Sequence, residues 1–424
     1  MTSPANIVRL GTVLFVTYGG GHIAKVAPVV KELERQGVNC TVLALTVGHA
    51  AARRLGLSPV GYRDCLHLVD ADKALAWGRK LLDGNTHPDV DAHESCCYLG
   101  INYLDWVERF GEAEAEQRYR EGGRRSFLPL AFMGRLIDEL QPAVVVSTSS
   151  PRSEQAAIEA AVQRGIPTLT MMDLFALPYD IYLRQPVHAD RITAMSEVVK
   201  SNLVAAGFDS GRVRVTGCPA YDALQEPAHA AAGAAFRRER GWEALKIVMW
   251  AGYKEEGSHV PESWQGATFG LEVERRLRAW VAARPDVALI VRYHPNQFHY
   301  FPSLGEQERV YLARPAEEPV QAQLHASDVV IVQTSTVGLE AALIGRRVLS
   351  LQYAPSVIDL GFDFSALGLA EGVPAMDDLV PILDRGADAS SGGSILPPAG
   401  RAAPRVAAEI RALARGAVAS TAQG

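Results

Sequence analysis

The sequence predicts an α/β protein built from two doubly wound units in tandem. Short apolar runs alternate with helical patterns along most of the chain, which is typical of parallel sheets covered by helices on both faces. The alternation is interrupted by a helical, alanine-rich stretch at 224–245 and then starts again. A chain of 424 residues is also too long for one hydrophobic core and fits two.

The first unit is expected to extend over residues 1–222. Its apolar runs, each followed by a helical pattern or a turn, are expected to form the strands of one sheet. In chain order these runs are TVLFVTY, NCTVLAL, PAVVVSTSS, PTLTMMD, DRITAMS and RVRVTGCP. The region 62–125 breaks the alternation because it is polar, aromatic and helical by turns. It is expected to be an insertion that either shapes a substrate site or only packs against the scaffold.

The second unit is expected to extend over residues 223–384. Its apolar runs are KIVMWAG, VALIVRYHPN, RVYLARP, DVVIVQTS and RRVLSLQY, with helical patterns between most of them. The remaining residues, 385–424, begin with a stretch rich in Gly, Ser and Pro, which predicts a loop. They end in a helical pattern that is expected to pack against the first unit.

Composition excludes several classes of function. The net charge of −6 gives no basic surface overall, so a nucleic-acid partner is not expected. No apolar run approaches the length of about 18 residues that a membrane-spanning helix needs. The five cysteines have no repeated spacing, which fits reduced thiols and a cytoplasmic protein. Since no D-x-D motif follows a predicted strand, neither a metal nor another cofactor is expected.

The stretch GGGHIAKVAP follows the first predicted strand. Glycines at this point, including Gly20 and Gly21, allow a ligand to approach the backbone closely. His22 is expected to begin the helix and to act as a general base, since imidazole titrates near neutral pH. Lys25, one turn later, would neutralise a phosphate or a carboxylate. The alternative is that His22 only caps the helix and that Lys25 is solvated.

The stretch TSTVGLEAALIG follows a predicted strand of the second unit. The hydroxyls of Thr334, Ser335 and Thr336, together with backbone N–H groups, would form a phosphate site. Glu340, about one turn into the helix, would accept hydrogen bonds from ribose hydroxyls. The alternative is a capping box in which Thr336 is the N-cap and Glu340 is solvated.

Two further stretches of the second unit offer cations. Arg292 and His294 lie at the end of VALIVRYHPN, two residues apart and so on one side of the strand, where they would suit a diphosphate. Lys254, in the stretch YKEEGSH, would contact the same diphosphate. The alternatives are that His294 caps the sheet edge as a neutral imidazole and that 253–259 is a solvated loop.

Three stretches resemble known families. AMSEVVKSNLVAAGFDSGRVRVTGCPAYDAL resembles the corresponding stretch of the non-hydrolysing UDP-N-acetylglucosamine 2-epimerases. GGGHIAKVAPVVKELERQG resembles both those epimerases and the inverting UDP-sugar glycosyltransferases, and QTSTVGLEAALIGRRVLSL resembles the nucleotide-binding motif of both groups. The resemblance implies a GT-B fold, which is two Rossmann-like domains with a cleft between them. The first domain would bind an acceptor and the second a nucleotide sugar.

The resemblance also implies roles for residues. By it, His22 takes the proton of the acceptor hydroxyl, and Glu340 holds the ribose. Three catalytic positions of the epimerases are not matched, since residues 147–150 are hydroxyl-rich, TMMDLF offers only Asp173, and WAGYKEEG has no histidine. We therefore expect a metal-independent, inverting glycosyltransferase that uses a nucleotide-diphosphate sugar, UDP-linked, and a small-molecule or glycan acceptor. An epimerase-like enzyme, a non-catalytic nucleotide-sugar-binding protein and a homodimer are left open.

Overall fold

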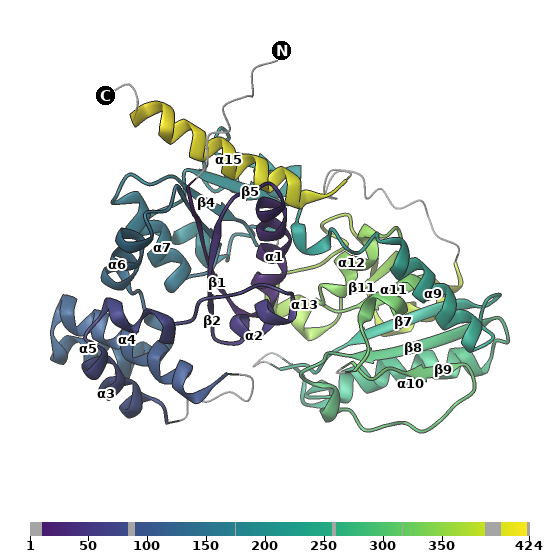
Figure 1. Ribbon diagram of the computed structural model, residues 1–424. Helices are drawn as coiled ribbons and strands as arrows, with labels where there is room; N and C mark the ends of the chain where they lie inside the picture. The colour runs from purple at the N-terminus through teal and green to yellow at the C-terminus, as the bar shows by residue number, and fades with distance from the viewer. Residues whose placement is uncertain are drawn as a thin grey trace, which may run out of the picture. The chain divides into compact units, whose positions relative to one another are not determined.

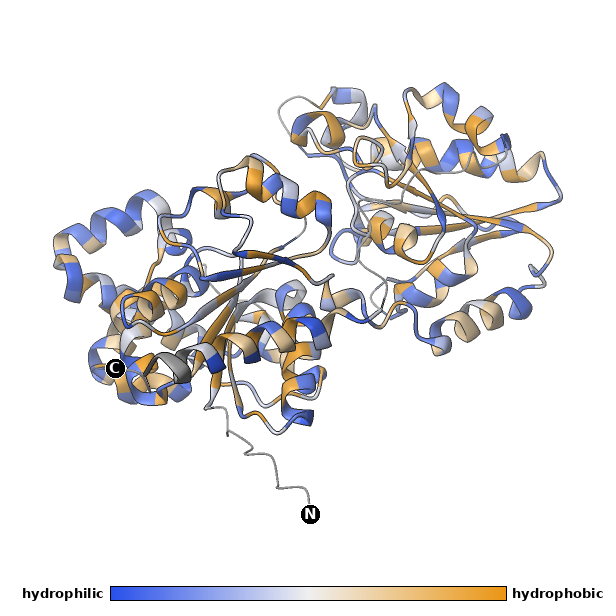
Figure 2. Ribbon diagram, turned by 90° about the horizontal axis from the view of Figure 1, so that it is seen from above, coloured by the Kyte–Doolittle hydropathy of each residue, from blue (hydrophilic) through white to orange (hydrophobic). Residues whose placement is uncertain are grey.

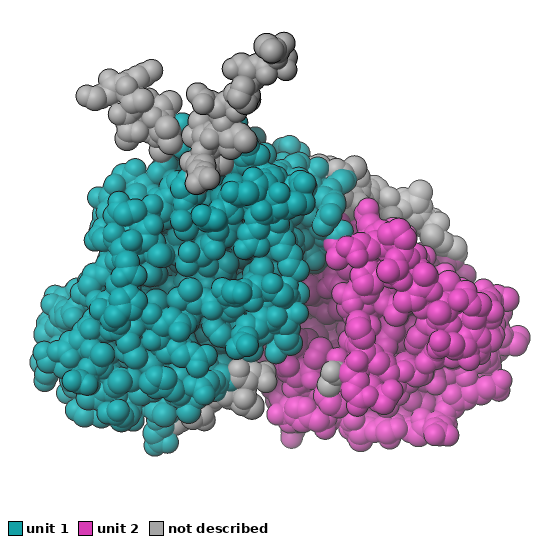
Figure 3. All heavy atoms as spheres, in the orientation of Figure 1, with its two compact units in different colours: residues 1–222, 397–424 teal, residues 223–396 magenta. Residues whose placement is uncertain are grey.

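The computed structural model describes residues 11–83, 90–173, 175–256, 260–315, 317–385 and 400–421. The chain divides into two compact units (Figure 3): unit 1 holds residues 1–222 and 397–424, and unit 2 holds residues 223–396. Each unit has a six-stranded sheet over the residues described, and every strand pairs in parallel with its neighbours. The predicted α/β class with two parallel sheets is therefore confirmed.

The sheet of unit 1 has the strand order β2-β1-β3-β4-β5-β6. Its strands are buried because α/β layering covers both faces, and β3 is buried along its whole length. The chain first moves outward from β1 to β2 and then returns to the other side of β1 at β3, so the order reverses between β1 and β3. The strands are β1 (Val13–Tyr18), β2 (Cys40–Leu45), β3 (Val144–Thr148), β4 (Thr168–Met171), β5 (Arg191–Ala194) and β6 (Val213–Val215).

Helix α15 completes unit 1 from the far end of the chain. Val406 and Ile410 pack into the same apolar cluster as Ile23 and Val26 of α1, and the two helices lie side by side in Figure 1. Asp222 holds the start of α15, since its carboxylate accepts the N–H groups of the first two helical residues at 2.6 and 2.8 Å. The helices on this sheet are α1 (Gly19–Arg35), α2 (Val47–Arg54), α7 (Ser153–Val162), α8 (Glu197–Ala205) and α15 (Ala402–Thr421), with the short 3-10 helices η3 (Ile181–Arg184) and η4 (Pro219–Tyr221).

The region after β2 folds into a helical layer of its own. Helix α4 is buried over most of its length, and its buried residues include Glu94, Asn102 and Asp105 as well as apolar ones. It crosses α3 so closely that a Cβ on Gly100 would lie 1.8 Å from the carbonyl oxygen of Ala74, which only glycine avoids. The elements of this helical layer are η1 (Arg63–Leu68), α3 (Ala71–Leu81), α4 (Ala92–Phe110), α5 (Glu112–Gly122), η2 (Gly123–Ser126) and α6 (Leu130–Leu140).

The sheet of unit 2 has the strand order β12-β11-β10-β7-β8-β9, which reverses between β7 and β10. Its core is formed by alternate residues of the central strands, such as Trp250, Val291 and Ile331. The strands are β7 (Lys246–Gly252), β8 (Val287–Tyr293), β9 (Val310–Leu312), β10 (Val329–Val332), β11 (Arg347–Leu351) and β12 (Glu371–Val373). The helices are α9 (Pro227–Glu239), η5 (Glu262–Trp264), α10 (Thr268–Ala282), η6 (Phe298–Tyr300), α11 (Val320–Ala326), α12 (Val337–Leu343), α13 (Pro355–Leu360), η7 (Met376–Asp378) and α14 (Leu379–Asp384).

Hydropathy follows this layering in each unit. The central strands are mainly hydrophobic and the helices carry alternating hydrophobic and hydrophilic residues (Figure 2), as amphipathic covering helices do. None of the helices in the described ranges combines the length and the apolar character needed to cross a bilayer. Most of the predicted loop at 385–400 lies outside the described residues.

Candidate functional site

The candidate residues of unit 1 lie at the carboxyl edge of its sheet. His22 is in the first turn of α1, directly after β1, while Thr148 ends β3 and Asp173 follows β4. This is where the strand order reverses, between β1 and β3. Open α/β sheets bind their ligands at such a switch point, outside the carboxyl ends of the strands.

The glycines before His22 lie within helix α1 and do not form a separate turn ahead of it. Only Gly19 needs a left-handed backbone, with a φ of 78°. Gly20 and Gly21 already belong to α1, which begins at Gly19 and not at His22 as expected from the sequence. A Cβ added to Gly21 would meet nothing within 4 Å, so the space beside it is open.

His22 is tied through a hydroxyl to a buried carboxylate. Its Nδ1 lies 2.5 Å from Oγ1 of Thr148, and that hydroxyl bonds to Oε1 of Glu154. Glu154 is 0% exposed and also accepts the N–H of Tyr18 at 3.1 Å. When Glu154 is ionised it accepts the proton of Thr148, and Thr148 in turn accepts the N–H of Nδ1. That tautomer leaves Nε2 unprotonated, 3.5 Å from Oγ of Ser150.

Burial shifts both ends of this chain of hydrogen bonds. Burial, together with the positive charges of Lys25 and Arg152, lowers the pKa of His22 to about 4, below the near-neutral value expected from the sequence. Burial raises the pKa of Glu154 to about 7 in spite of its hydrogen bonds. At neutral pH the imidazole is therefore neutral and able to accept a proton, and the carboxyl is close to its own midpoint.

Lys25 and Asp173 complete this edge of the sheet. The Lys25 ammonium forms an ion pair with Asp173 and is only 6% exposed, so the alternative of a solvated lysine is wrong. Burial lowers the pKa of Lys25. Asp173 Oδ2 lies 3.8 Å from Nε2 of His22, and the Asp173 N–H donates to Ser149 Oγ at 3.0 Å. Two carboxyl groups thus flank His22.

Glu154 and Arg152 belong to this site although no motif in the sequence points to them. Both lie in the turn from β3 into α7, where Arg152 takes a left-handed backbone with a φ of 72°. The pattern SPRSEQAA looks like the exposed start of a helix, and nothing in it signals that Glu154 is turned inward beneath β1. The hydroxyl-rich run at 147–150 was the only signal available.

The candidate residues of unit 2 also lie at the carboxyl edge of a sheet, after β10, β7 and β8. Tyr253 follows β7, and its hydroxyl lies 2.5 Å from Oγ1 of Thr334 after β10. The Lys254 ammonium lies 3.9 Å from the centre of the Tyr300 ring and pairs with Glu256. The contact between Tyr253 and Thr334 joins the ends of β7 and β10, across the point where the strand order reverses.

Glu340 is a half-buried carboxyl group on α12. Burial raises its pKa to about 7, against the opposing charge of Arg292. Among the described residues, none donates a hydrogen bond to its carboxylate. This half-buried carboxyl is therefore available to a ligand. Thr336 makes no side-chain capping bond, so the capping-box alternative lacks its N-cap contact.

Arg292 and His294 differ in their availability. Arg292 is 7% exposed and donates to Gln323 Oε1 at 2.9 Å and to the carbonyl oxygen of Glu318 at 2.8 Å. Its guanidinium is thus engaged with its own unit, which favours a supporting role over the expected contact with a diphosphate. His294 is exposed; its Nδ1 accepts the N–H of Asn296 at 3.2 Å, so a proton on Nε2 is available to a ligand.

The hydroxyls after β10 have modest local roles. Ser335 Oγ accepts the N–H of Val337 at 3.4 Å, Thr334 bonds to Tyr253, and Thr336 is exposed. Glu255 was expected in a solvated loop but is 1% exposed, and it accepts two hydrogen bonds from Ser356. It therefore fastens the segment after β7 to the start of α13.

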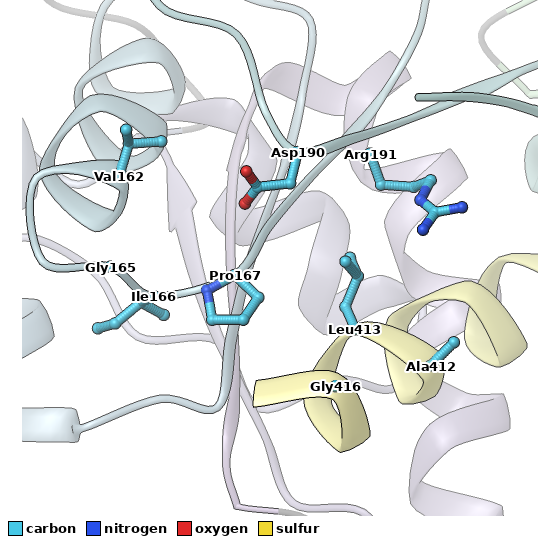
Figure 4. Close-up of a pocket in the computed structure, with 9 residues that line it drawn as sticks. All are labelled: Val162, Gly165, Ile166, Pro167, Asp190, Arg191, Ala412, Leu413 and Gly416. Atoms are coloured by element: carbon cyan, nitrogen blue, oxygen red, sulfur yellow. The ribbon is translucent and has the colours of Figure 1, made fainter. Parts of the chain in front are cut away.

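A separate hollow of about 410 Å³ lies at the opposite, amino edge of the unit 1 sheet (Figure 4). Its charged residues are already paired, since Asp190 accepts two hydrogen bonds from Thr168 and Arg191 pairs with Glu409 at 3.2 Å. Because ligands of open sheets bind at the carboxyl edge, this hollow is not the candidate site. Over the described residues, no group of three histidine, cysteine or acidic side chains could hold a metal ion.

Comparisons with known proteins identify the fold. No protein-family model matches the chain, and no curated protein matches it either. The UDP-GlcNAc 2-epimerase of Neisseria meningitidis, solved with bound UDP-GlcNAc, is similar with 15% identity and a TM-score of 0.56, over 94% of this chain and 99% of that one. The UDP-GlcNAc 2-epimerase of Methanocaldococcus jannaschii has 13% identity and a TM-score of 0.59, over 93% and 98%. The wall teichoic acid polymerase TagF has 11% identity and a TM-score of 0.55, over 97% and 90%. The predicted GT-B fold is thereby confirmed.

Proposed function

We propose that the protein is a glycosyltransferase that moves a sugar from a nucleotide-diphosphate donor to an acceptor hydroxyl. The observation that carries the proposal is the hydrogen-bonded series from His22 through Thr148 to the buried Glu154. It leaves Nε2 unprotonated at the switch point of the unit 1 sheet, which is what a general base for an acceptor hydroxyl requires.

In this mechanism the acceptor hydroxyl lies within hydrogen-bond reach of Nε2. Its proton passes to Nε2 while its oxygen forms a bond to the anomeric carbon of the donor sugar. The bond from that carbon to the diphosphate breaks, and the electron pair leaves with the diphosphate. Attack on the face opposite the leaving group inverts the configuration. The imidazolium that forms is stabilised by Glu154, whose Oε1 lies 3.8 Å from Nδ1.

Unit 2 supplies the nucleotide site of the proposal. Glu340 would accept both ribose hydroxyls, which would satisfy the one candidate carboxylate that makes no hydrogen bond within the described part of unit 2. Lys254 and His294 would stabilise the negative charge that develops on the diphosphate. The hydroxyls of Thr334, Ser335 and Thr336 would donate to the diphosphate oxygens. Arg292 would support the diphosphate through its positive charge without contacting it. A UDP-linked donor is favoured because the N. meningitidis structure holds UDP-GlcNAc.

A second candidate is a UDP-GlcNAc 2-epimerase. Two carboxyl groups, Glu154 and Asp173, flank His22, and one of them has its pKa raised to about 7. Epimerisation needs an acid and a base on the donor sugar itself, and such a pair could supply them. The solved epimerases of the same fold favour this candidate as well.

One experiment separates these functions. The protein is incubated with UDP-GlcNAc and followed by phosphorus and proton NMR, with and without a mixture of hydroxyl-bearing acceptors. A transferase releases UDP only when an acceptor is present. An epimerase converts the sugar at C2 without an acceptor, and a binding protein changes nothing although UDP-GlcNAc binds by calorimetry. His22→Ala is the matched control, since it should stop release of UDP but not binding.

A further inference from the structure

Arg152 stands in the candidate site of unit 1 in an unusual backbone state. It is the residue that turns the chain from β3 into α7, with φ 72° and ψ −121°. Non-glycine residues rarely take this conformation, and such strain persists where the surrounding structure holds it for a purpose. Here the turn sends the guanidinium back over the end of β1, where it lies 3.9 Å from the centre of the Tyr18 ring.

The positive charge of Arg152 is not neutralised within unit 1. No carboxylate oxygen of the described residues lies within 4.0 Å of its guanidinium, and its buried Nε has no hydrogen-bond partner. The other cation of the site, Lys25, is paired with Asp173. Glu154, two residues further along the chain, uses Oε1 for Tyr18 and Thr148 instead. The half-buried guanidinium therefore has no counter-ion among the described residues and is available to an anionic ligand.

The helical layer supplies the wall beside Arg152. Tyr62 bonds through its hydroxyl to Ser153 at 2.9 Å, which fastens the layer to the start of α7. Its ring lies 5.2 Å from that of Tyr98, whose hydroxyl is within reach of the charges of Arg152 and Arg124. Two positive charges, those of Arg152 and Arg124, thus act on this side of the helical layer.

We propose that Arg152 anchors a small oxyanion group, a phosphate or a carboxylate, that the acceptor substrate carries. The identification of the bound molecule as an acceptor rests on the proposed function. The anion site itself does not depend on it. A guanidinium stacked on a ring keeps its N–H edge available, and that edge matches the two oxygens of a phosphate or carboxylate.

An anion bound to Arg152 would also change the basicity of His22. The charge of Arg152 is one of the causes that lower the pKa of His22. An oxyanion bound to Arg152 cancels that charge, so the imidazole becomes a stronger base when an acceptor is in place. A neutral acceptor leaves the base weakened. The site thereby selects acceptors that carry an anionic group.

The test uses the full-length protein labelled with ¹³C at histidine, at pH 7 and constant ionic strength. The His22 signal is assigned by its loss in His22→Gln and is followed during titration with inorganic phosphate and, separately, with acetate. We expect a saturable shift of this signal with at least one of the two anions. Arg152→Gly should weaken binding about tenfold or more. This change suits the left-handed backbone, so the fold should hold. Arg125→Ala, an exposed arginine of the helical layer, is the matched control and should bind as the wild type does.

The two anions distinguish the source of the oxyanion. A shift with phosphate alone indicates a phosphorylated acceptor, a shift with acetate alone indicates a carboxylate, and a shift with both indicates a site for either group. No saturable shift, or the same shift in Arg152→Gly, overturns the proposal. UDP binding, measured in parallel by calorimetry, reports on unit 2, so a failure of the nucleotide site is seen separately from a failure of the anion site.

Discussion

Replacing Glu154 with glutamine should make the protein more stable and less active. Glutamine has the same shape, and its amide oxygen can still accept from Tyr18 and Thr148 as the carboxylate does. It cannot ionise, however, and so it removes a charge that is 0% exposed. The cost of burying that charge is the quantity that the substitution measures.

The size and sign of the effect follow from the pKa. Because the pKa of Glu154 rises from 4.5 to about 7 on folding, the folded state binds the proton more tightly than the unfolded state. This stabilisation is fully present below about pH 4.5 and is lost as the pH rises through about 7. A shift of this size corresponds to about 3 kcal/mol. Relative to wild type, Glu154→Gln should therefore gain about 2–3 kcal/mol more in free energy of unfolding at pH 8 than at pH 5.

Urea titrations of wild type and variant at both pH values measure this difference. Glu340→Gln in unit 2 is the positive control. Burial raises the pKa of Glu340 to about 7 as well, so its stability should depend on pH in the same direction. The same Glu154→Gln protein should lose about 10- to 100-fold in kcat, because the imidazolium loses a charged partner of about 1.5–3 kcal/mol. A variant no more stable than wild type at pH 8, relative to pH 5, would refute the argument that a buried, ionisable Glu154 supports His22.

Three further outcomes are expected. Glu340→Ala should weaken UDP binding by about 1–3 kcal/mol in calorimetry, because ribose hydroxyls lose their acceptor; an unchanged affinity removes Glu340 from the site. Sugar transfer should continue in EDTA, since the mechanism uses only protein cations to stabilise the diphosphate; activity that EDTA abolishes and magnesium or manganese restores would contradict this. Asp222→Ala should destabilise α15 by about 1 kcal/mol through loss of its cap, seen as faster amide exchange over residues 402–410; unchanged exchange would show that packing alone holds the helix.

The fold could be predicted because its signals are local. Each buried parallel strand is a continuous apolar run, such as VVVST of β3, and each covering helix has its own amphipathic period. The strand order could not be predicted in the same way, since it depends on which runs pair across the chain. The start of α1 was misplaced because glycines usually end helices, whereas here Gly20 and Gly21 lie within the first turn.

The candidate site was predictable where a motif carries it and not where tertiary burial does. His22 and Glu340 follow strands in recognisable motifs. Glu154 reaches the end of β1 because the chain makes a left-handed turn at Arg152, and a single sequence gives no sign of that turn. Arg292 was expected to face a diphosphate, but its guanidinium bonds to Gln323 of α11, a residue distant in the chain.

The most direct test of the account is the turnover rate of His22→Ala with the donor and acceptor identified by the NMR assay. General bases contribute about 10²- to 10⁴-fold, so kcat should fall by that factor while the affinity for UDP, held by unit 2, stays as in wild type. A variant that keeps more than about a tenth of the wild-type rate would contradict the account and leave His22 with a structural role only.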